Sequence, residues 1–359
     1  MSRLKQIATL RSALIDKHND LFDRVTAIRE RSIANLPELA LQAKEMLEAK
    51  LAKVYPVKDE QQAAKILSDI LKGEKQVSRS FSNTMTEIKF DHIMADMGIK
   101  VNLTRLEEIV NSEKGLPYSG HPHLVNIDLS TKIVREALQK YTNHKDTLEP
   151  SELRRLASQR VKESILSGEY GITGVNGVVA ENGSLVLAED EGNVRAVSNL
   201  PYRHVAIVGL DKIDQSAEDA MSVIQALSIF GAGQITPTYF SLIAGPSRTA
   251  DIEFKMAYGM HGPKEVHVLM LDNGRLSIRE QGAGALLKCI NCGCCFENCA
   301  ELASKQKWED TMLSPKGLAL GIVQGKLSPL QEMKDMSEFL CPVGLSPEDV
   351  IANLGTIKP

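Results

Sequence analysis

The cysteines are the feature that most restricts how this chain of 359 residues can fold. Five of the six fall in the stretch CINCGCCFENC between Cys289 and Cys299, and the sixth, Cys341, lies far downstream, directly before Pro342. The N-terminus leads into charged sequence, and no stretch approaches the roughly 20 apolar residues that span a bilayer, so we expect a cytoplasmic protein without a transmembrane segment. Disulfides are rare in that compartment, which favours metal binding by the clustered cysteines.

The spacing of the run indicates which metal group to expect. Four of its cysteines match the C-x2-C-x2-C-x3-C pattern of bacterial ferredoxins, in which the fourth cysteine ligates a different cluster from the first three. A cysteine followed by proline, as in Cys341-Pro342, typically completes the first cluster. We therefore predict one [4Fe–4S] cluster with four ligands: Cys289, Cys292, Cys295 and Cys341.

Alternatives to this ligand set remain open at the level of the sequence. Cys299 could be the fourth ligand in place of Cys341, and Cys294, which falls off the repeat, is expected to be a spare thiol near the cluster. A structural zinc ion also accepts four thiolates, although zinc sites favour two paired C-x2-C knuckles.

Hydrophobic periodicity divides the chain into three regions. Hydrophobic residues make up 43% and charged residues 25% of the chain, as in globular proteins. The net charge of −4 and the scattered Lys and Arg residues suggest no nucleic-acid partner. We predict a helical N-terminal region (1–75), an α/β domain (76–276), and a cysteine-bearing, ferredoxin-like helical module (277–359).

Within the α/β region, two apolar runs, 204–209 and 265–271, are typical of strands buried on both faces. Residues 178–187 predict a hairpin, with Asn182-Gly183 as a tight two-residue turn and Glu181 beside it. Residues 61–71 predict a further helix before this region.

A series of short motifs appears in order along the α/β region. The motifs are Gly171-Ile-Thr-Gly-Val-Asn-Gly177, Ala180-Glu-Asn-Gly-Ser184, Asp190-Glu-Gly-Asn193, Leu200-Pro201, His204-Val-Ala-Ile-Val-Gly-Leu-Asp-Lys212, Gly245-Pro-Ser-Arg-Thr-Ala-Asp-Ile-Glu253, Gly262-Pro-Lys-Glu-Val-His267 and Asp272-Asn-Gly-Arg275. Together they resemble the LUD-domain family of lactate-utilisation proteins, specifically its iron–sulfur subunit, from about residue 78 to residue 342.

The resemblance implies a NagB/RpiA/CoA-transferase-like α/β fold and a role as the iron–sulfur electron-transfer subunit of a system that oxidises lactate or another 2-hydroxyacid. The family's lactate subunit usually carries two full cysteine runs, whereas this chain keeps one run plus Cys341. No G-x-G-x-x-G fingerprint is present, so hydride chemistry is expected on a flavin-containing oxidoreductase partner, with other iron–sulfur or LUD-domain subunits as further partners.

Two other functions remain open. The chain could itself be an enzyme that acts on a thioester or phosphorylated small molecule, with Glu181 as nucleophile or base, as a glutamate is in CoA-transferases of related fold, and with a structural or sensing cluster. It could also be a cluster-dependent regulator without catalysis.

Residues for a small-molecule pocket can be proposed from the same motifs. The glycines allow close approach of the backbone to a ligand, and exposed amides in such turns can hold an anion. Glu191 competes with Glu181 for a catalytic role, and Lys212 or Arg275 could pair with an anionic substrate. The predicted pocket residues are Gly171, Gly174, Ser184 and Asn193, with Gly177 beside them.

Overall fold

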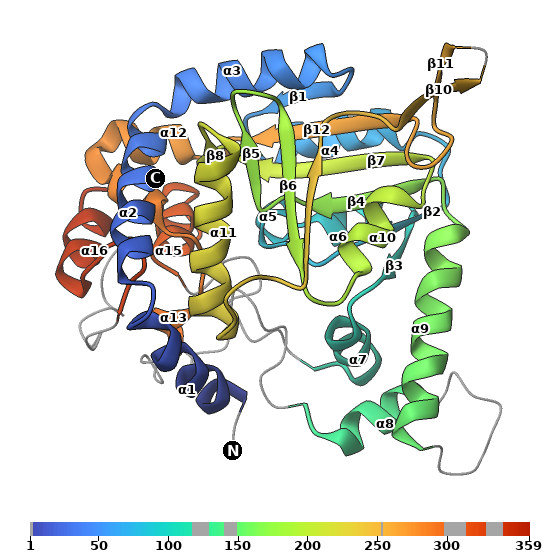
Figure 1. The fold of residues 1–359 in the computed structure, drawn as a ribbon, viewed down its shortest axis with the longest axis horizontal. Coiled ribbons are helices and arrows are strands. Elements are labelled where there is room, and N and C mark those ends of the chain that lie inside the picture. Colours follow the sequence, from blue (N-terminus) through green and yellow to red (C-terminus); the bar gives the residue numbers. More distant parts are fainter. Residues whose placement is uncertain (1–2, 117–128, 140–148, 253, 298–313, 328–339) are drawn as a thin grey trace.

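The computed structural model describes residues 3–116, 129–139, 149–252, 254–297, 314–327 and 340–359. Its centre is a six-stranded sheet in which every neighbouring pair is parallel (Figure 1). The order across the sheet is β1-β12-β7-β4-β2-β3. The strands are β1 (Lys53–Val57), β2 (Gln76–Arg79), β3 (Lys100–Leu103), β4 (Tyr170–Gly174), β7 (Arg203–Gly209) and β12 (Glu265–Leu271).

Strands β7 and β12 confirm the prediction of strands buried on both faces. In β7, Val205 and Ile207 pack into one hydrophobic cluster, whereas Ala206 and Val208 pack into a second. This alternation follows from the period of two in a strand, and it leaves no solvent-facing side in the middle of the sheet.

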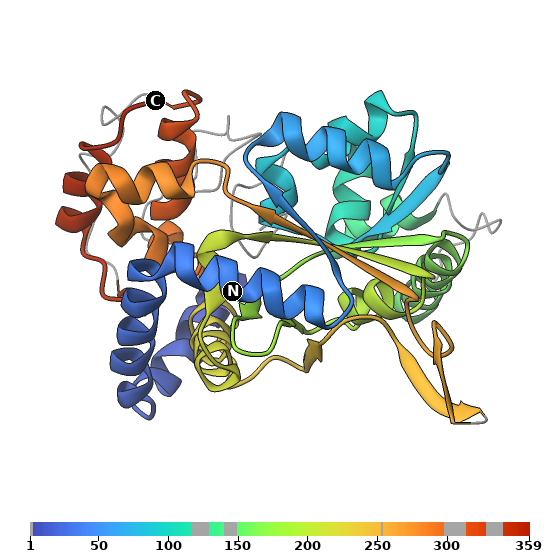
Figure 2. The same ribbon diagram turned by 90° about the horizontal axis from the view of Figure 1, so that it is seen from above.

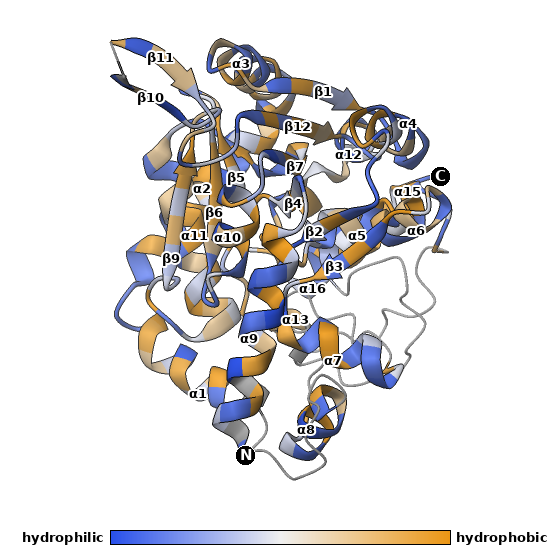
Figure 3. Cartoon of the chain, turned by 90° about the vertical axis from the view of Figure 1, so that its right-hand side faces the viewer, coloured by the Kyte–Doolittle hydropathy of each residue, from blue (hydrophilic) through white to orange (hydrophobic). Residues whose placement is uncertain are grey.

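Helices cover both faces of the sheet. The helices around the strands are α3 (Leu36–Ala49), α4 (Glu60–Ile70), α5 (Asn83–Glu87), α6 (Phe90–Asp96), α7 (Leu106–Lys114), α8 (Thr131–Gln139), α9 (Pro150–Leu166), α10 (Asn193–Asn199) and α11 (Ala217–Ala232), with the 3₁₀ turn η1 (Leu210–Lys212). Helix α4 confirms the helix predicted over residues 61–71. Helix α7 carries both hydrophilic and hydrophobic residues (Figure 3), and its buried residues are Glu107, Glu108, Val110 and Asn111.

A second sheet, ordered β8-β5-β6-β9, lies beside the first. Its strands are β5 (Gly177–Val179), β6 (Ser184–Glu189), β8 (Ile213–Asp214) and β9 (Tyr239–Ile243), and β10 (Arg248–Ile252) and β11 (Lys255–Tyr258) form a separate hairpin. The predicted hairpin is confirmed by the antiparallel pairing of β5 with β6. The predicted two-residue turn is wrong, because Val179 pairs with Ser184 and four residues lie between them.

The N-terminal helices pack against the C-terminal segment. Helices α1 (Arg3–Ile15) and α2 (Asn19–Ala34) lie near the last elements of the chain (Figure 2), which are α12 (Arg275–Ile278), η2 (Arg279–Ala283), η3 (Gly284–Lys288), α13 (Cys294–Glu297), α15 (Pro315–Val323) and α16 (Pro347–Leu354). One hydrophobic cluster contains Leu21 and Val25 of α2 together with Leu286 and Ala319. The cysteine-bearing segment therefore shares its core with the N-terminal helices.

The central sheet begins earlier in the chain than the predicted region boundaries imply. Strand β1 falls within the region predicted as helical, residues 1–75, and pairs with β12. The sheet thus begins before the predicted boundary at residue 76. Among the described residues, no helix is long and apolar enough to cross a membrane.

Candidate functional site

A cavity of about 580 Å³ opens at the carboxyl ends of the parallel strands. The chain runs from β2 outward to β3 and then returns across β2 to β4, so its direction reverses between β2 and β4. Ligands of open α/β sheets bind at such a reversal, outside the carboxyl ends of the strands. The cavity also falls within the range of roughly 300–1,000 Å³ that is usual for small-molecule sites.

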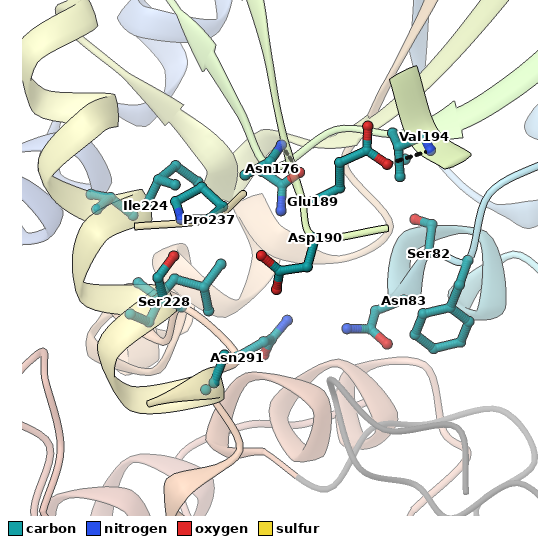
Figure 4. Close-up of a pocket in the computed structure, with 18 of the residues that line it drawn as sticks. Ser82, Asn83, Asn176, Glu189, Asp190, Val194, Ile224, Ser228, Pro237 and Asn291 are labelled. Atoms are coloured by element: carbon teal, nitrogen blue, oxygen red, sulfur yellow. Dashed lines mark hydrogen bonds between the residues drawn. The ribbon is translucent and has the colours of Figure 1, made fainter. Parts of the chain in front are cut away.

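Polar side chains from separate elements surround this cavity. In Figure 4, Asp190 points into the space between Asn83 at the start of α5 and Asn291 of the cysteine segment. The polar and charged lining residues include Arg29, Ser80, Ser82, Asn83, Arg105, Asn176, Glu189, Asp190, Glu191, Asn193, Asp211, Lys212, Asp214, Ser228, Asn291 and Lys316.

A buried ion network forms one wall. Asp211, directly after β7, pairs with Lys316 of α15 at 2.5 Å and with Arg275 at the start of α12. Arg275 also pairs with Glu87 at 2.8 Å. Burial opposes ionisation of Asp211, yet the attraction of Lys316, Arg275 and Lys212 lowers the pKa of its carboxyl. The network therefore stays charged in the folded protein.

Lys212, the next residue, has a different environment. Its Nζ donates to Oγ1 of Thr84 and to the carbonyl of Val175, each at 3.1 Å. Burial, together with repulsion by Lys316, lowers the pKa of Lys212 to about 8 against the attraction of Asp211. The cavity thus contains an ammonium group that titrates near neutral pH.

Two carboxylates at the end of β6 lie on the lining. Glu189 accepts hydrogen bonds from the backbone N–H groups of Val194 and Arg195, at 2.6 and 2.7 Å. Burial nevertheless raises the pKa of Glu189. Asp190 accepts from the backbone N–H and the hydroxyl of Thr238, at 2.8 and 3.1 Å. These contacts hold both carboxylates in place.

The cavity includes two of the four pocket residues predicted from sequence. Gly174 and Asn193 line it, whereas Gly171 and Ser184 do not. A Cβ at Gly171 would lie 1.9 Å from the carbonyl oxygen of Val197, so this glycine allows α10 to pack closely on β4.

Of the predicted catalytic and anion-binding residues, some line the cavity and others do not. Glu181 is exposed, lies outside the lining, and accepts a hydrogen bond from the backbone N–H of Ala217 at the start of α11. Glu191 lines the cavity, with Oε1 3.7 Å from Nε of Arg105. Arg275 is fully buried in the ion network and is not part of the lining. A catalytic role of Glu181 stays a prediction that this placement does not favour.

A second, smaller pocket gathers the described cysteines. Cys341 lies on it together with the cysteines of the run, and its wall is completed by Leu340, Pro342, Val343, Ser314 and Pro315. The cysteines on this pocket are Cys289, Cys292, Cys294, Cys295 and Cys341. All four predicted ligands thus line one pocket, and none of the five cysteines is in a disulfide. Cys299 lies outside the described residues.

Two thiols of this pocket, those of Cys292 and Cys341, are poor anions in this setting. Burial raises the pKa of Cys292 well above its ordinary value, and the nearby Cys294, Cys341 and Cys295 raise it further. Burial also raises the pKa of Cys341 to about 11. Cys294, predicted to be a spare thiol, is buried, and Nη1 of Arg11 donates to its Sγ at 2.8 Å. Among the described residues, no three His, Cys, Asp or Glu side chains are grouped to hold a single metal ion.

The two pockets share a wall. Cys289 and Ile290 line both the cysteine pocket and the large cavity. A ligand in the cavity would therefore lie against the backbone segment that carries the first cysteine of the run.

Several lining residues were missed by the sequence analysis. Ser80, Ser82 and Asn83 directly follow the short strand β2, and polar residues at the end of a parallel strand are a usable signal. Lys316 is the single charged residue in the apolar helix α15, which was a second signal. Nothing in the local sequence brings Asn291 to the cavity, because that depends on how the C-terminal segment packs.

Comparison with known proteins identifies the family. The model of the LUD domain family matches residues 40–271, which is more than half of the chain. The chain belongs to the LUD domain family. The resemblance found in the motifs is thereby confirmed, and the match begins within α3 and includes β1, in agreement with the extent of the sheet.

Relatives of this LUD protein carry two kinds of name. "Uncharacterized electron transport protein YkgF" of Escherichia coli is 28% identical over 77% of this chain and 57% of that protein. "Lactate utilization protein B" of Macrococcus caseolyticus is 27% identical over 77% of this chain and 57% of that protein. The chain thus spans little more than half the length of these relatives. The crystal structure of a DUF162 family protein from Deinococcus radiodurans has a TM-score of 0.35 at 13% identity, covering 66% of this chain and 98% of that chain.

Proposed function

We propose that this LUD protein is an iron–sulfur electron-transfer component of a system that oxidises lactate or a related 2-hydroxyacid. The observation that carries the proposal is the pocket on which Cys341 lies beside the cysteines of the run. The names of the relatives, electron transport protein and lactate utilization protein, point in the same direction.

The cysteine pocket is the proposed iron–sulfur site. Its proposed ligands are Cys289, Cys292, Cys295 and Cys341, with Cys299 as the alternative fourth ligand. When bound, a [4Fe–4S] cluster would accept and release single electrons. Thiols whose pKa is raised by burial and by one another need a bound cation to become thiolates, and metal coordination deprotonates a thiol. The chain also supplies apolar cover from Leu340 and Val343.

The proposal includes a flavin-bearing partner. Oxidation of a 2-hydroxyacid removes two electrons, and a flavin can pass such a pair on one electron at a time. We propose that the partner approaches the cysteine segment and that the chain alone does not turn over lactate. The ferredoxin-like character of residues 277–359 and the relation to NagB/RpiA/CoA-transferase folds are part of the same proposal.

The content of iron and sulfide tests the cluster. The protein purified without oxygen should contain about four irons and about four labile sulfides per chain. Zinc without sulfide would show that the cysteines bind a structural zinc ion instead of an iron–sulfur cluster. Reduction of the protein by a reduced flavoprotein should bleach the visible absorption of the cluster, and failure to accept electrons would contradict a role in transfer.

Cysteine variants test the ligands. Cys341→Ser should lose most of the iron, whereas Cys294→Ser should keep it, because only Cys341 completes the ferredoxin-type ligand set. Cys299→Ser should do less harm than Cys341→Ser. If iron survives in Cys341→Ser and is lost in Cys299→Ser, the fourth ligand is Cys299.

The large cavity favours a second candidate, an enzyme that acts on a thioester or phosphorylated small molecule. Glu189 and Asp190, rather than Glu181, lie on its lining. Anaerobic assays of the isolated chain with 2-hydroxyacids and acyl thioesters distinguish the candidates. Thioester turnover that is lost in Glu189→Gln but kept in Glu181→Gln, with iron content unchanged, would replace the electron-transfer proposal.

A further inference from the structure

Most charges on the large cavity are already neutralised by the protein. Arg29 pairs with Asp214 at 3.0 Å, and the hydroxyl of Ser32 donates to the same carboxylate at 2.8 Å. Lys316 is bound to Asp211, as described above. These cations are held by carboxylates of the wall, so they have little charge left for a ligand.

Lys212 is the exception among the lining cations. Both acceptors of its ammonium group, the hydroxyl of Thr84 and the carbonyl of Val175, are neutral. Among the described residues, no carboxylate lies within ion-pair distance of its Nζ. A partly buried cation with only neutral acceptors is stabilised by any anion that reaches it.

An independent observation also points to a ligand. Ser80 lines the same cavity, is 1% exposed, and its hydroxyl has no hydrogen-bond partner among the described residues. A buried hydroxyl without a partner is unfavourable, and such groups normally bond to protein, water or ligand. Across the cavity, the carboxylate of Asp190 points inward and can accept from a donor on a ligand (Figure 4).

We propose that the cavity binds a small organic anion whose single acidic group accepts a hydrogen bond from Lys212, with Ser80 and Asp190 as polar contacts for the rest of the molecule. The nearby carboxylates of Glu189 and Asp190 disfavour a ligand with several negative charges. None of these three contacts is a cysteine. Because Cys289 and Ile290 form the shared wall, the bound anion would lie beside the cysteine pocket.

The charge of Lys212 makes this binding depend on pH. The groups that act on Lys212 are Lys316 and Arg275, which repel its proton, and Asp211 and Glu87, which hold it. With a pKa of about 8, the ammonium form dominates at pH 7 and declines above pH 8. Affinity should therefore fall by about tenfold for each pH unit well above the pKa, until the neutral amine sets a floor.

Calorimetric titration of the anaerobically purified full chain tests the site. The probes are L-lactate, pyruvate and inorganic phosphate, which separate a carboxylate from a phosphate as the acidic group. At least one should bind the wild type at pH 7, and Lys212→Met should weaken that binding by roughly 10- to 100-fold, since a hydrogen bond to a charged group is lost. Lys44→Met is the control, because Lys44 lies on the surface of α3, paired with Glu48.

A second variant separates charge from structure. Lys212→Gln keeps a donor for the carbonyl of Val175 but has no charge, so it should weaken binding nearly as much as Lys212→Met while retaining the thermal unfolding midpoint more closely. If no probe binds the wild type, or if both variants bind as tightly as Lys44→Met, the proposal is wrong. Iron content measured on the same samples shows whether the cluster fails separately.

Discussion

The ammonium group of Lys316 lies 2.5 Å from Oδ2 of Asp211, and this contact joins the cysteine-bearing segment to the carboxyl end of β7. Both side chains are buried, with exposed fractions of 2% and 0%. Arg275 donates to the other carboxylate oxygen, so the carboxylate is shared by two helices that follow the sheet in the chain.

Loss of that contact should destabilise the protein. In Lys316→Met, one oxygen of Asp211 loses its partner in a buried position while Arg275 keeps the other. We expect the free energy of unfolding to fall by about 2 kcal/mol, as for a buried polar group left without its partner. Urea unfolding under anaerobic conditions measures this, with Lys44→Met expected to change stability by less than about 0.5 kcal/mol. Equal stability of the two variants would contradict the role assigned to the pair.

The depressed pKa of Lys212 should appear in the pH dependence of stability. Between the folded pKa of about 8 and the ordinary value of 10.5, the unfolded chain binds more protons at this residue than the folded protein. Stability contributed by this residue therefore rises with pH over that range. The wild type should gain stability relative to Lys212→Met between pH 8 and pH 10.5, measured by urea unfolding at each pH. A difference that does not change with pH would show that Lys212 has an ordinary pKa.

His204 should make the fold sensitive to acid. Burial, with a further contribution from repulsion by His267, lowers the pKa of His204 to about 3. The unfolded chain binds the extra proton below pH 6.5, so this residue lowers stability as the pH falls from 6.5 towards 3, by up to about 1.4 kcal/mol per pH unit.

The variant His204→Gln tests that sensitivity. The ring nitrogen Nε2 of His204 lies 2.8 Å from Oγ1 of Thr173, and glutamine can replace this hydrogen bond without titrating. Thermal unfolding at pH 5 and pH 7 should show a smaller loss on acidification in the variant. A loss as large as in the wild type would assign the acid sensitivity to other groups.

A pair of glycine variants tests the close packing of α10 on β4. In Gly171→Ala, the new methyl group would lie 1.9 Å from the carbonyl of Val197, which is backbone and cannot turn away, so we expect strong destabilisation of several kcal/mol. In Gly177→Ala, the nearest atom would be 3.5 Å away, an ordinary contact. Yield and thermal midpoint should fall in the first variant only. A stable Gly171→Ala protein would contradict the close packing of α10 on β4.

Much of the fold follows from local sequence. The runs that became β7 and β12 are apolar over their length because both faces are covered, and this pattern was visible without the structure. Strand β1 was not visible in the sequence. It contains Lys53, Pro56 and a half-buried middle, as is typical of a strand at the edge of a sheet. Only its pairing with β12 defines it as a strand.

The candidate site was less predictable than the fold. The cysteine ligands were predicted from their spacing and stay a prediction, although the four residues line one pocket. Glycines marked the cavity only in part, since Gly174 lies on it whereas Gly171 serves packing. The role of Lys212 depends on the position of Asp211, Lys316 and Arg275, three residues from separate elements, and no local pattern encodes that arrangement.

The shared core of the two chain ends also has a consequence for how the protein is made. Leu21 and Val25 of α2 are buried against residues of the C-terminal segment such as Leu286, which leave the ribosome more than 250 residues later. Until then, the apolar face of α2 lacks part of its cover, and exposed apolar surface on a nascent chain promotes aggregation and chaperone binding. The last segment to be synthesised is thus needed to complete the burial of one of the first helices.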